Sequence, residues 1–559
     1  MSEKISDPRQ PKAYDIVTCL GLMLLFTLLL GRMVYLHNAD YQQATGAWVD
    51  SGSLLQDYLR IVGPPVNLNQ THQYHTGIYG WVYNSIVVWG IIALKAVFGG
   101  AEIGFPVFAA WAKAVSFAFT VASIGLLFAT IRKFGAHYFI ALFATLAVAI
   151  YPPTAKFSYE VHPEAAGVFF VILMLWSLRH YVEQPAARER YLLLAWAAAV
   201  TSVLAKQSFM IYPLAPLLVV FAVTLRDPAF LDLKRQVVSR LAGRFVLIGL
   251  LLVLAFHPYA ILDFPGFLAK QKEIHAFHAT LSMPIGRSFR SWIALMWDTD
   301  VWLLVAMGAA VIRLTLNRFR GENSAKLVDI CCVLLLVYLV LIVDQLRFYI
   351  LRAYLLPILP VAAIVLVGLS SSLRGVAGAV VKAAVLILLV GTIPAYALNS
   401  AGSVAYDLML GNFNTMRVRD PLMRLGPRPW TVFFSSSLAV PGQLYKQAID
   451  NFKFGGKADI DRGFANLHPD LVIVDKTWRY SAAQEFEDAA LANGMVLVAE
   501  MDGESPSQWS CWLHYSKQQC VGQVQQLLYR ERFGSPASTD SKLLFYAKPE
   551  LAPLFAGIK

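Results

Sequence analysis

The chain has 559 residues, of which 57% are hydrophobic and only 15% are charged, and its mean hydropathy is +0.54. In soluble domains about a quarter of the residues are charged. This composition therefore excludes a water-soluble protein and indicates a chain that lies mostly within a membrane. The formal net charge of +11 does not indicate a nucleic-acid partner, because the basic residues cluster at alternate ends of the apolar stretches, as cytoplasmic loops do.

Apolar stretches long enough to cross a bilayer as helices recur from Ile16 to Leu398. Placing the basic clusters in the cytoplasm predicts eleven transmembrane helices, with the N-terminus inside and the C-terminal part outside. The first stretch is too long for a signal-peptide core and lacks a cleavage site, so we expect a retained anchor. The expected spans are residues 16–36, 106–131, 138–152, 164–182, 190–206, 209–225, 244–262, 292–316, 327–345, 348–370 and 379–399.

The segment from Gly77 to Phe98 is apolar enough to span, but counting it as a crossing would put every later basic cluster on the wrong side. We expect it to form a helix or re-entrant hairpin at the outer interface, where Trp81 and Lys95 suit the headgroup level. It belongs to the first outer loop, residues 37–105, which is long and rich in polar and aromatic residues. Long ordered loops tend to be functional.

The composition changes after Asn399, where charge rises and long apolar runs stop. Short β-like runs at residues 430–434 and 471–474 alternate with helical stretches. This predicts a transmembrane domain over residues 1–400 and a soluble α/β domain over residues 401–559. Cys511 and Cys520 in that domain are close enough in sequence to pair, which would suit an oxidising compartment outside the membrane; two free thiols are the alternative.

Ionisable residues gather at the outer ends of different predicted spans, where their cost in a bilayer makes their position informative. They are Asp40, Glu160, His162, Glu164, Lys206, His257, Asp263, His275, His278, Arg287, Arg290, Asp344, Arg347 and Arg352. Carboxylates beside cations at one membrane face suit a lipid-linked sugar phosphate. Arg and Lys bind phosphate oxygens at the boundary, and a carboxylate can accept the proton of an acceptor hydroxyl.

Five segments in order resemble the landmarks of the C-type glycosyltransferase (GT-C) superfamily. They are His37-Asn-Ala-Asp-Tyr41, Tyr74-His-Thr-Gly-Ile-Tyr-Gly-Trp-Val-Tyr-Asn-Ser85, Tyr159-Glu-Val-His-Pro-Glu164, Leu204-Ala-Lys-Gln207 and Arg347-Phe-Tyr-Ile-Leu-Arg-Ala-Tyr-Leu-Leu-Pro-Ile-Leu-Pro360. The likeness covers roughly residues 10 to 400 and resembles protein O-mannosyltransferases and lipid A aminoarabinose transferases most. It implies a GT-C-like helical bundle as the catalytic domain, followed by the α/β domain in the periplasm.

The resemblance also implies a role for each matching residue. Asp40 corresponds to the catalytic carboxylate and Glu164 to a second acidic residue. Lys206 corresponds to a lysine facing the carrier phosphate, and Arg347 or Arg352 to a basic residue near the carrier; we add His75 as a donor contact. The implied reaction moves one sugar, with inversion, from a polyprenyl-phosphate donor to a hydroxyl of a glycan, lipid or protein at the outer face of a bacterial inner membrane. We expect no cofactor, no metal and no nucleic acid.

Other interpretations remain open. Asp40 could be an ordinary residue at a loop entry, and Asp50 and Asp57 are rival bases in the same loop. Lys206 could reach to the interface as a terminal lysine does, and the two arginines could anchor a span in the headgroups. The alternative functions are a lipid-linked sugar transporter or flippase, and a glycan polymerase or oligosaccharyl transferase, the last of which would need a divalent metal.

Overall fold

The computed structural model describes most of the helical part and about half of the C-terminal part. The described residues are 13–38, 81–97, 105–183, 189–223, 234–280, 284–317, 323–345, 352–372, 375–410, 418, 421–435, 438, 440, 444–450, 454, 456–476, 483–502 and 542–558. They form two compact units that divide between Ser400 and Ala401, and each is described by itself.

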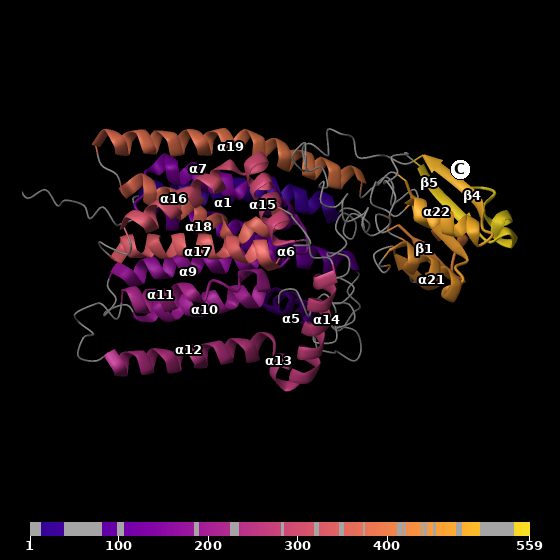
Figure 1. Ribbon diagram of the computed structural model, residues 1–559, viewed down its shortest axis with the longest axis horizontal. Helices are drawn as coiled ribbons and strands as arrows, with labels where there is room; N and C mark the ends of the chain where they lie inside the picture. The colour runs from indigo at the N-terminus through magenta and orange to yellow at the C-terminus, as the bar shows by residue number, and fades with distance from the viewer. Residues whose placement is uncertain are drawn as a thin grey trace, which may run out of the picture. The chain divides into compact units, whose positions relative to one another are not determined.

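The first unit is a bundle of helices that run mostly side by side (Figure 1). Its elements are α1 (Ala13–Asn38), α5 (Trp81–Val97), α6 (Phe105–Lys133), α7 (Tyr138–Ala149), α8 (Pro152–Tyr159), α9 (Glu164–Glu183), α10 (Glu189–Ala205), η2 (Gln207–Phe209), α11 (Leu214–Ala222), α12 (Lys234–Phe256), α13 (Tyr259–Leu262), α14 (Phe264–Thr280), α15 (Ile285–Thr299), α16 (Val301–Asn317), α17 (Asn323–Gln345), η5 (Arg352–Ile358), α18 (Leu359–Ser372) and α19 (Gly375–Leu410).

The predicted class of a helical, multi-pass membrane protein is confirmed. Six helices among the described residues are long and apolar enough to cross a membrane, or up to eight if each of two bent helix pairs counts as one span. Three shorter apolar helices, at Ala13–Leu29, Trp81–Val97 and Gln207–Ala222, lie outside that count. The expected number of eleven spans is therefore not confirmed.

The largest difference from the expected spans lies at residues 292–316, which form two helices rather than one. α15 ends at Thr299, α16 begins at Val301, and the two are bent by 117°. The break falls at Asp300, whose buried carboxylate binds a distant arginine. A similar but smaller bend of 58° joins α7 to α8, where Pro152 lacks the N–H that would continue the first helix.

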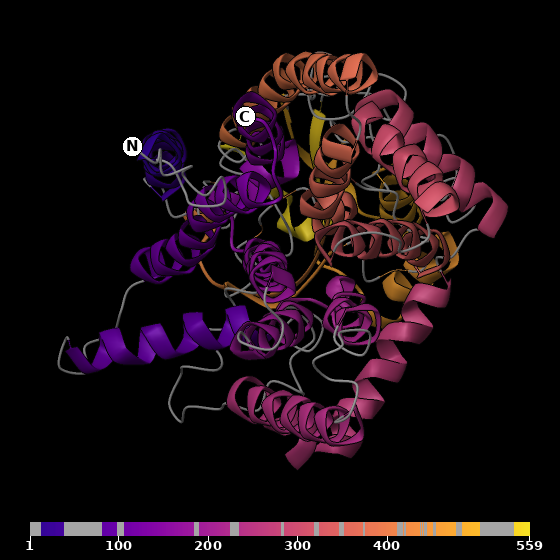
Figure 2. The same cartoon turned by 90° about the vertical axis from the view of Figure 1, so that its left-hand side faces the viewer.

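Two helices lie across the bundle instead of along it. α5, the segment for which we expected an interfacial helix or hairpin, forms one helix that buries Val82, Val87 and Ile91. Figure 2 looks along the bundle and shows α5 from its side, and the pink α14 lies across the bundle in both views. This orientation is the one expected of helices at a membrane interface.

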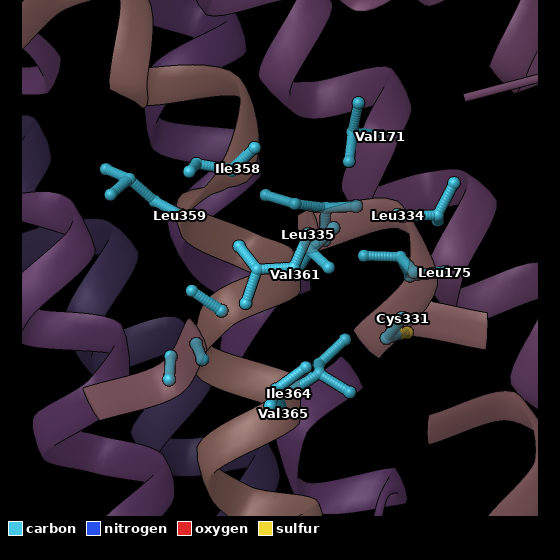
Figure 3. Packing of buried hydrophobic residues seen from close by; sticks show 14 of the residues in the cluster. Val171, Leu175, Cys331, Leu334, Leu335, Ile358, Leu359, Val361, Ile364 and Val365 are labelled. Atoms are coloured by element: carbon cyan, nitrogen blue, oxygen red, sulfur yellow. The ribbon is translucent and has the colours of Figure 1, made fainter. Parts of the chain in front are cut away.

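Apolar side chains interlock in the centre of the bundle between α9, α17 and α18. Val171 and Leu175 of α9 face Leu335 of α17 and Val361 of α18 (Figure 3). Small residues let the helices approach closely: a Cβ at Gly167 of α9 would lie 2.4 Å from the Phe209 ring. Close approach through small residues is the usual way in which helices associate in a membrane.

The second unit is a five-stranded sheet with helices on it. Its strands are β1 (Arg428–Phe434), β2 (Tyr445–Asp450), β3 (Leu471–Asp475), β4 (Val496–Asp502) and β5 (Lys542–Ala547), in the order β2-β1-β3-β5-β4. β1 pairs in parallel with β2 and β3, whereas β5 is antiparallel to β3 and β4. The helices are α21 (Lys457–Leu467), α22 (Ala483–Ala492) and η8 (Pro549–Phe555).

Alternate strand residues bury against separate cores on the two faces of this sheet. Phe433 packs with Phe464 of α21 and Phe486 of α22, whereas Val432 packs with Phe555 of η8 on the other face. The expected α/β domain is thus confirmed in class. The expected Cys511–Cys520 disulfide lies outside the described residues.

Candidate functional site

Helices α9 and α10 bring two predicted site residues together at one end of the bundle. Glu164 is the first residue of α9, and Lys206 follows the last residue of α10. Both positions suit the helix dipole, which favours a negative group at an N-terminus and a positive group at a C-terminus. The Lys206 ammonium group donates to Glu164 Oε1, and His162 Nδ1 donates to Glu164 Oε2. All three residues are buried.

A second ionic group lies on the adjoining helices. Lys156 Nζ of α8 lies 3.7 Å from Oε1 of Glu160, the residue that follows this helix, and the charge of Glu160 also acts on Lys113 of α6. Ser116 of α6, three residues after Lys113, contacts the first group, because the backbone N–H of His162 donates to Ser116 Oγ at 3.3 Å. Buried ionisable groups of this kind are rare in membrane proteins and generally mark functional sites.

The short helix η5 lies beside these groups and is held by three buried tyrosines. The hydroxyls of Tyr151, Tyr338 and Tyr212 donate to the backbone carbonyls of Arg352, Tyr354 and Pro357. A helix interrupted at Pro357 leaves carbonyls without backbone donors, and in an apolar surrounding these must find other partners. The Tyr354 ring also faces Lys206, whose Nζ lies 5.6 Å from the ring centroid.

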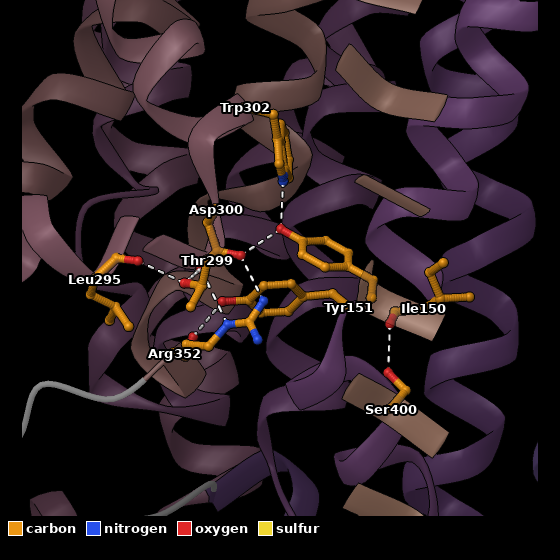
Figure 4. Close-up of polar contacts among 9 residues, drawn as sticks. Ile150, Tyr151, Leu295, Thr299, Asp300, Trp302, Arg352 and Ser400 are labelled. Atoms are coloured by element: carbon orange, nitrogen blue, oxygen red, sulfur yellow. Dashed lines mark hydrogen bonds and ion pairs between the residues drawn. The ribbon is translucent and has the colours of Figure 1, made fainter. Parts of the chain in front are cut away.

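Arg352 at the start of η5 forms a buried network with the break between α15 and α16 (Figure 4). Its NH2 donates to Asp300 Oδ1 at 2.7 Å and its Nε donates to Oδ2 at 3.2 Å. The Tyr396 hydroxyl donates to Oδ1 at 2.5 Å and accepts from Trp302 Nε1 at 2.7 Å. Thr299 Oγ1 donates to Oδ2 at 2.8 Å. The Asp300 carboxylate therefore accepts two hydrogen bonds from Arg352 and one from Tyr396, while the single Thr299 proton is shared between Asp300 and the Leu295 carbonyl.

One nitrogen of the Arg352 guanidinium group takes no part in the hydrogen bonds of this network. Arg352 NH1 is buried and has no hydrogen-bond partner among the residues that the structure describes. A guanidinium group has five N–H donors in a rigid fork, so fixing Nε and NH2 also fixes the direction of NH1. A buried charged donor without a partner is costly. NH1 has no hydrogen-bond acceptor among the described residues, while the guanidinium carbon lies 5.0 Å from the Tyr151 ring centroid and 5.3 Å from that of Tyr396.

The structure brings together only some of the residues expected from the sequence. Glu164 and Lys206 are in direct contact, and Arg352 lies on η5 two residues before Tyr354, whose ring Lys206 faces. Asp40, His75 and Arg347 lie outside the described residues, as do the rival bases Asp50 and Asp57.

Three charged residues of the site were not singled out from the sequence: Lys113, Lys156 and Asp300. Lys113 and Asp300 fall inside expected spans, and a charge inside an apolar run is the signal that could have found them. Within the described ranges, no three His, Cys, Asp or Glu side chains gather as metal ligands.

A small cavity lies next to this site, between α6, α7, α8 and α9. Its volume is about 20 Å³, and its lining includes Phe157, Val168 and Leu356. The hydroxyls of Thr145 and Thr154 line it without a hydrogen-bond partner among the described residues. This volume suits a water molecule and is too small for a sugar.

The sequence matches no protein-family model and no curated protein. Among solved structures, ArnT from Cupriavidus metallidurans in the apo state aligns with a TM-score of 0.42 and 14% identity, over 86% of this chain and 96% of that one. ArnT bound to undecaprenyl phosphate aligns over the same shares with a TM-score of 0.44 and 14% identity. The oligosaccharyltransferase AglB from Archaeoglobus fulgidus, in complex with an inhibitory peptide and a dolichol-phosphate, aligns with a TM-score of 0.47 and 10% identity, over 96% of this chain and 89% of that one. Likenesses of this strength do not by themselves assign a family or an activity to the chain.

Proposed function

We propose that this chain is a GT-C-type glycosyltransferase that takes a single sugar from a polyprenyl-phosphate donor at the outer face of a bacterial inner membrane. The observation that carries the proposal is Arg352, a buried cation whose NH1 has no partner among the described residues. A phosphate oxygen is the acceptor that an arginine in this geometry binds best.

The charge of the surroundings supports an anionic ligand. The buried groups around α8 and η5 comprise four cations, namely Lys113, Lys156, Lys206 and Arg352, and three carboxylates, namely Glu160, Glu164 and Asp300. One negative charge would balance this set, and electrostatic attraction is strongest where water is excluded. The donor phosphate would bind between Arg352 NH1 and Lys206, which faces the ring of Tyr354 on the same short helix as Arg352.

The reaction then needs few further groups. The bond between the anomeric carbon and the phosphate oxygen breaks, and the leaving polyprenyl phosphate keeps the electron pair as an anion that Lys206 and Arg352 stabilise. The acceptor oxygen attacks the opposite face, and its proton passes to a carboxylate, for which we propose Asp40. A single displacement of this kind inverts the anomeric centre. Glu164, bonded to both His162 and Lys206, would position Lys206.

The test compares two buried arginines that each pair with an aspartate. Purified full-length protein in lipid nanodiscs is given a polyprenyl-phosphate sugar together with a methyl glycoside as hydroxyl acceptor, and the release of polyprenyl phosphate is measured. R352K keeps a charge opposite Asp300 but loses the oriented NH1, so KM for the donor should rise about tenfold, as for one lost charged hydrogen bond. R313K, the matched control at the Arg313–Asp329 pair, should leave KM unchanged.

An equal KM in R352K and the wild type would remove Arg352 from the phosphate site. D40N in the same assay should abolish release while donor binding persists, and retained turnover would reject Asp40 as the base. If the wild type releases no polyprenyl phosphate from donors carrying a hexose, a pentose or an amino sugar, the proposed function is wrong.

A further inference from the structure

Two polar side chains whose ring nitrogens have no hydrogen-bond partner among the described residues lie against each other where α5, α12 and α14 meet. His257 follows the last residue of α12 and is 1% exposed, and Trp81 is the first residue of α5. Their rings stack at 3.6 Å between centroids. Trp81 Nε1 and both ring nitrogens of His257 are buried and have no hydrogen-bond partner within the described part of the chain.

The surrounding contacts hold this pair rigidly. The Phe267 ring of α14 meets both rings edge-on, at 5.6 Å from Trp81 and 5.8 Å from His257. Ser85, one turn along α5 from Trp81, donates to the carbonyl of Phe256 at 3.0 Å. The backbone of His257 is bonded as well, since its N–H donates to the carbonyl of Val253 at 2.7 Å. The missing partners are therefore those of the side chains alone.

The chemistry of the missing partner can be read from the atoms. Indole Nε1 only donates, whereas a neutral imidazole has one N–H donor and one lone-pair acceptor. An anion could accept from the N–H groups but has no proton for the imidazole lone pair, and a cation could not accept from the indole. A hydroxyl accepts and donates at once. Neighbouring hydroxyls, as on a sugar ring, would satisfy all three nitrogens, and leaving such buried groups unsatisfied is costly.

The position links this pair to the proposed donor site. Gln271 lies four residues after Phe267 on α14, and its side-chain oxygen accepts from Gln207 Nε2 at 3.1 Å. Gln207 is the neighbour of Lys206 along the chain. One helical turn advances about 5.4 Å. Phe267, against which the pair packs, thus lies about one turn of α14 from Gln271, which contacts the neighbour of Lys206.

We propose that Trp81 and His257 form a subsite that binds carbohydrate hydroxyls. The inference rests on the proposed function only for the source of the hydroxyl, which is either the sugar of the donor or the acceptor glycan. The chain offers a matched control pair of the same residue types, Trp176 and His180 of α9, whose rings lie 4.2 Å apart at the opposite end of that helix from Glu164.

The first experiment does not need turnover. Saturation-transfer difference NMR is recorded on full-length protein in nanodiscs with methyl α-glucopyranoside, methyl α-mannopyranoside and methyl β-arabinopyranoside as probes. We expect signals for the wild type, H180F and W176F, and binding about tenfold weaker in H257F and W81F, which keep an aromatic ring but lose the nitrogens. H257Q, which retains a donor and an acceptor, should recover part of the binding if the loss is one of hydrogen bonds rather than of folding.

Two results would overturn the subsite: equal signals in the wild type, H257F and W81F, or no signal for any probe with the wild type, which would mean that water alone occupies the site. The second experiment separates the two sources. It measures turnover with a polyprenyl-phosphate sugar. If the bound hydroxyl belongs to the donor sugar, H257F should raise the donor KM. If the bound hydroxyl belongs to the acceptor, H257F should leave the donor KM unchanged and abolish the stimulation of turnover by added methyl glycoside. Absence of any turnover in the wild type would reject the proposed function and leave the NMR result to decide the subsite.

Discussion

Two buried arginine–aspartate pairs in the helical unit differ in the other contacts that their arginines make. Arg352 pairs with Asp300 and Arg313 with Asp329, and in each pair the arginine side chain is 6% exposed and the aspartate 0%. They lie roughly 20 Å apart along α16 by helix geometry, since Asp300 directly precedes this helix and Arg313 is near its end. Burial and charge alone would therefore give them the same role.

Their remaining contacts give them different roles. Arg313 donates from Nε to Asp329 at 2.5 Å and from NH2 to the carbonyl of Ala325 at 3.0 Å, so it joins α16 to α17. Arg352 donates from Nε and NH2 to Asp300, whereas NH1 has no hydrogen-bond partner among the described residues. A buried donor without a described hydrogen-bond partner therefore indicates a ligand, whereas a buried ion pair by itself does not.

The largest expected effect comes from removing either aspartate. D300A and D329A should each lower the free energy of unfolding by about 3–5 kcal/mol, because each leaves a buried guanidinium unpaired. Thermal unfolding of the purified protein in detergent measures this loss. D300A should also raise the donor KM, since Arg352 loses its orientation, while D329A should not. An equal rise of KM in both variants would remove the distinction between the two pairs.

A smaller effect is expected from the hydroxyl that supports Asp300. Y396F removes a donor to the carboxylate and leaves Trp302 Nε1 without its acceptor. The unfolding free energy should fall by about 1–3 kcal/mol. T392V on the same helix removes only a bond to the carbonyl of Leu388 and serves as the control. If Y396F costs no more than T392V, the Tyr396 hydroxyl does not stabilise the network around Asp300.

The smallest effect is expected from an exposed ion pair. Glu189 accepts from Arg240 at 3.0 Å and from Arg244 at 2.8 Å, but both arginine side chains are about half exposed. E189Q should lower the unfolding free energy by less than about 1 kcal/mol. The effect should shrink further with added salt, while the effect of D300A should not. A loss as large as that of D300A would show that burial does not separate these pairs.

The sequence allowed part of the site to be predicted. Glu164 and Lys206 flank apolar runs, where a charge is visible from the pattern alone, and the structure brings them into contact. Asp300 was missed because residues 292–316 resemble one continuous span. Its partner Arg352 lies 52 residues away, and such a pairing depends on tertiary structure rather than on local pattern.

The α/β unit shows the same limit. The runs at residues 430–434 and 471–474 were predicted from β-branched and aromatic residues, and they lie within β1 and β3. The order of the strands could not be predicted. β5 begins at Lys542 and still pairs between β3 and β4, a register that depends on side-chain packing across the whole sheet.

The three tyrosine bonds to η5 have a mechanical consequence. Each hydroxyl donates to a different carbonyl within the six residues from Arg352 to Pro357. Sliding η5 by a single residue would break all three bonds at once, and all three tyrosines are buried. The three bonds therefore fix the position of η5 along its own axis. A ligand that binds Arg352 would contact a backbone segment that is held at three points.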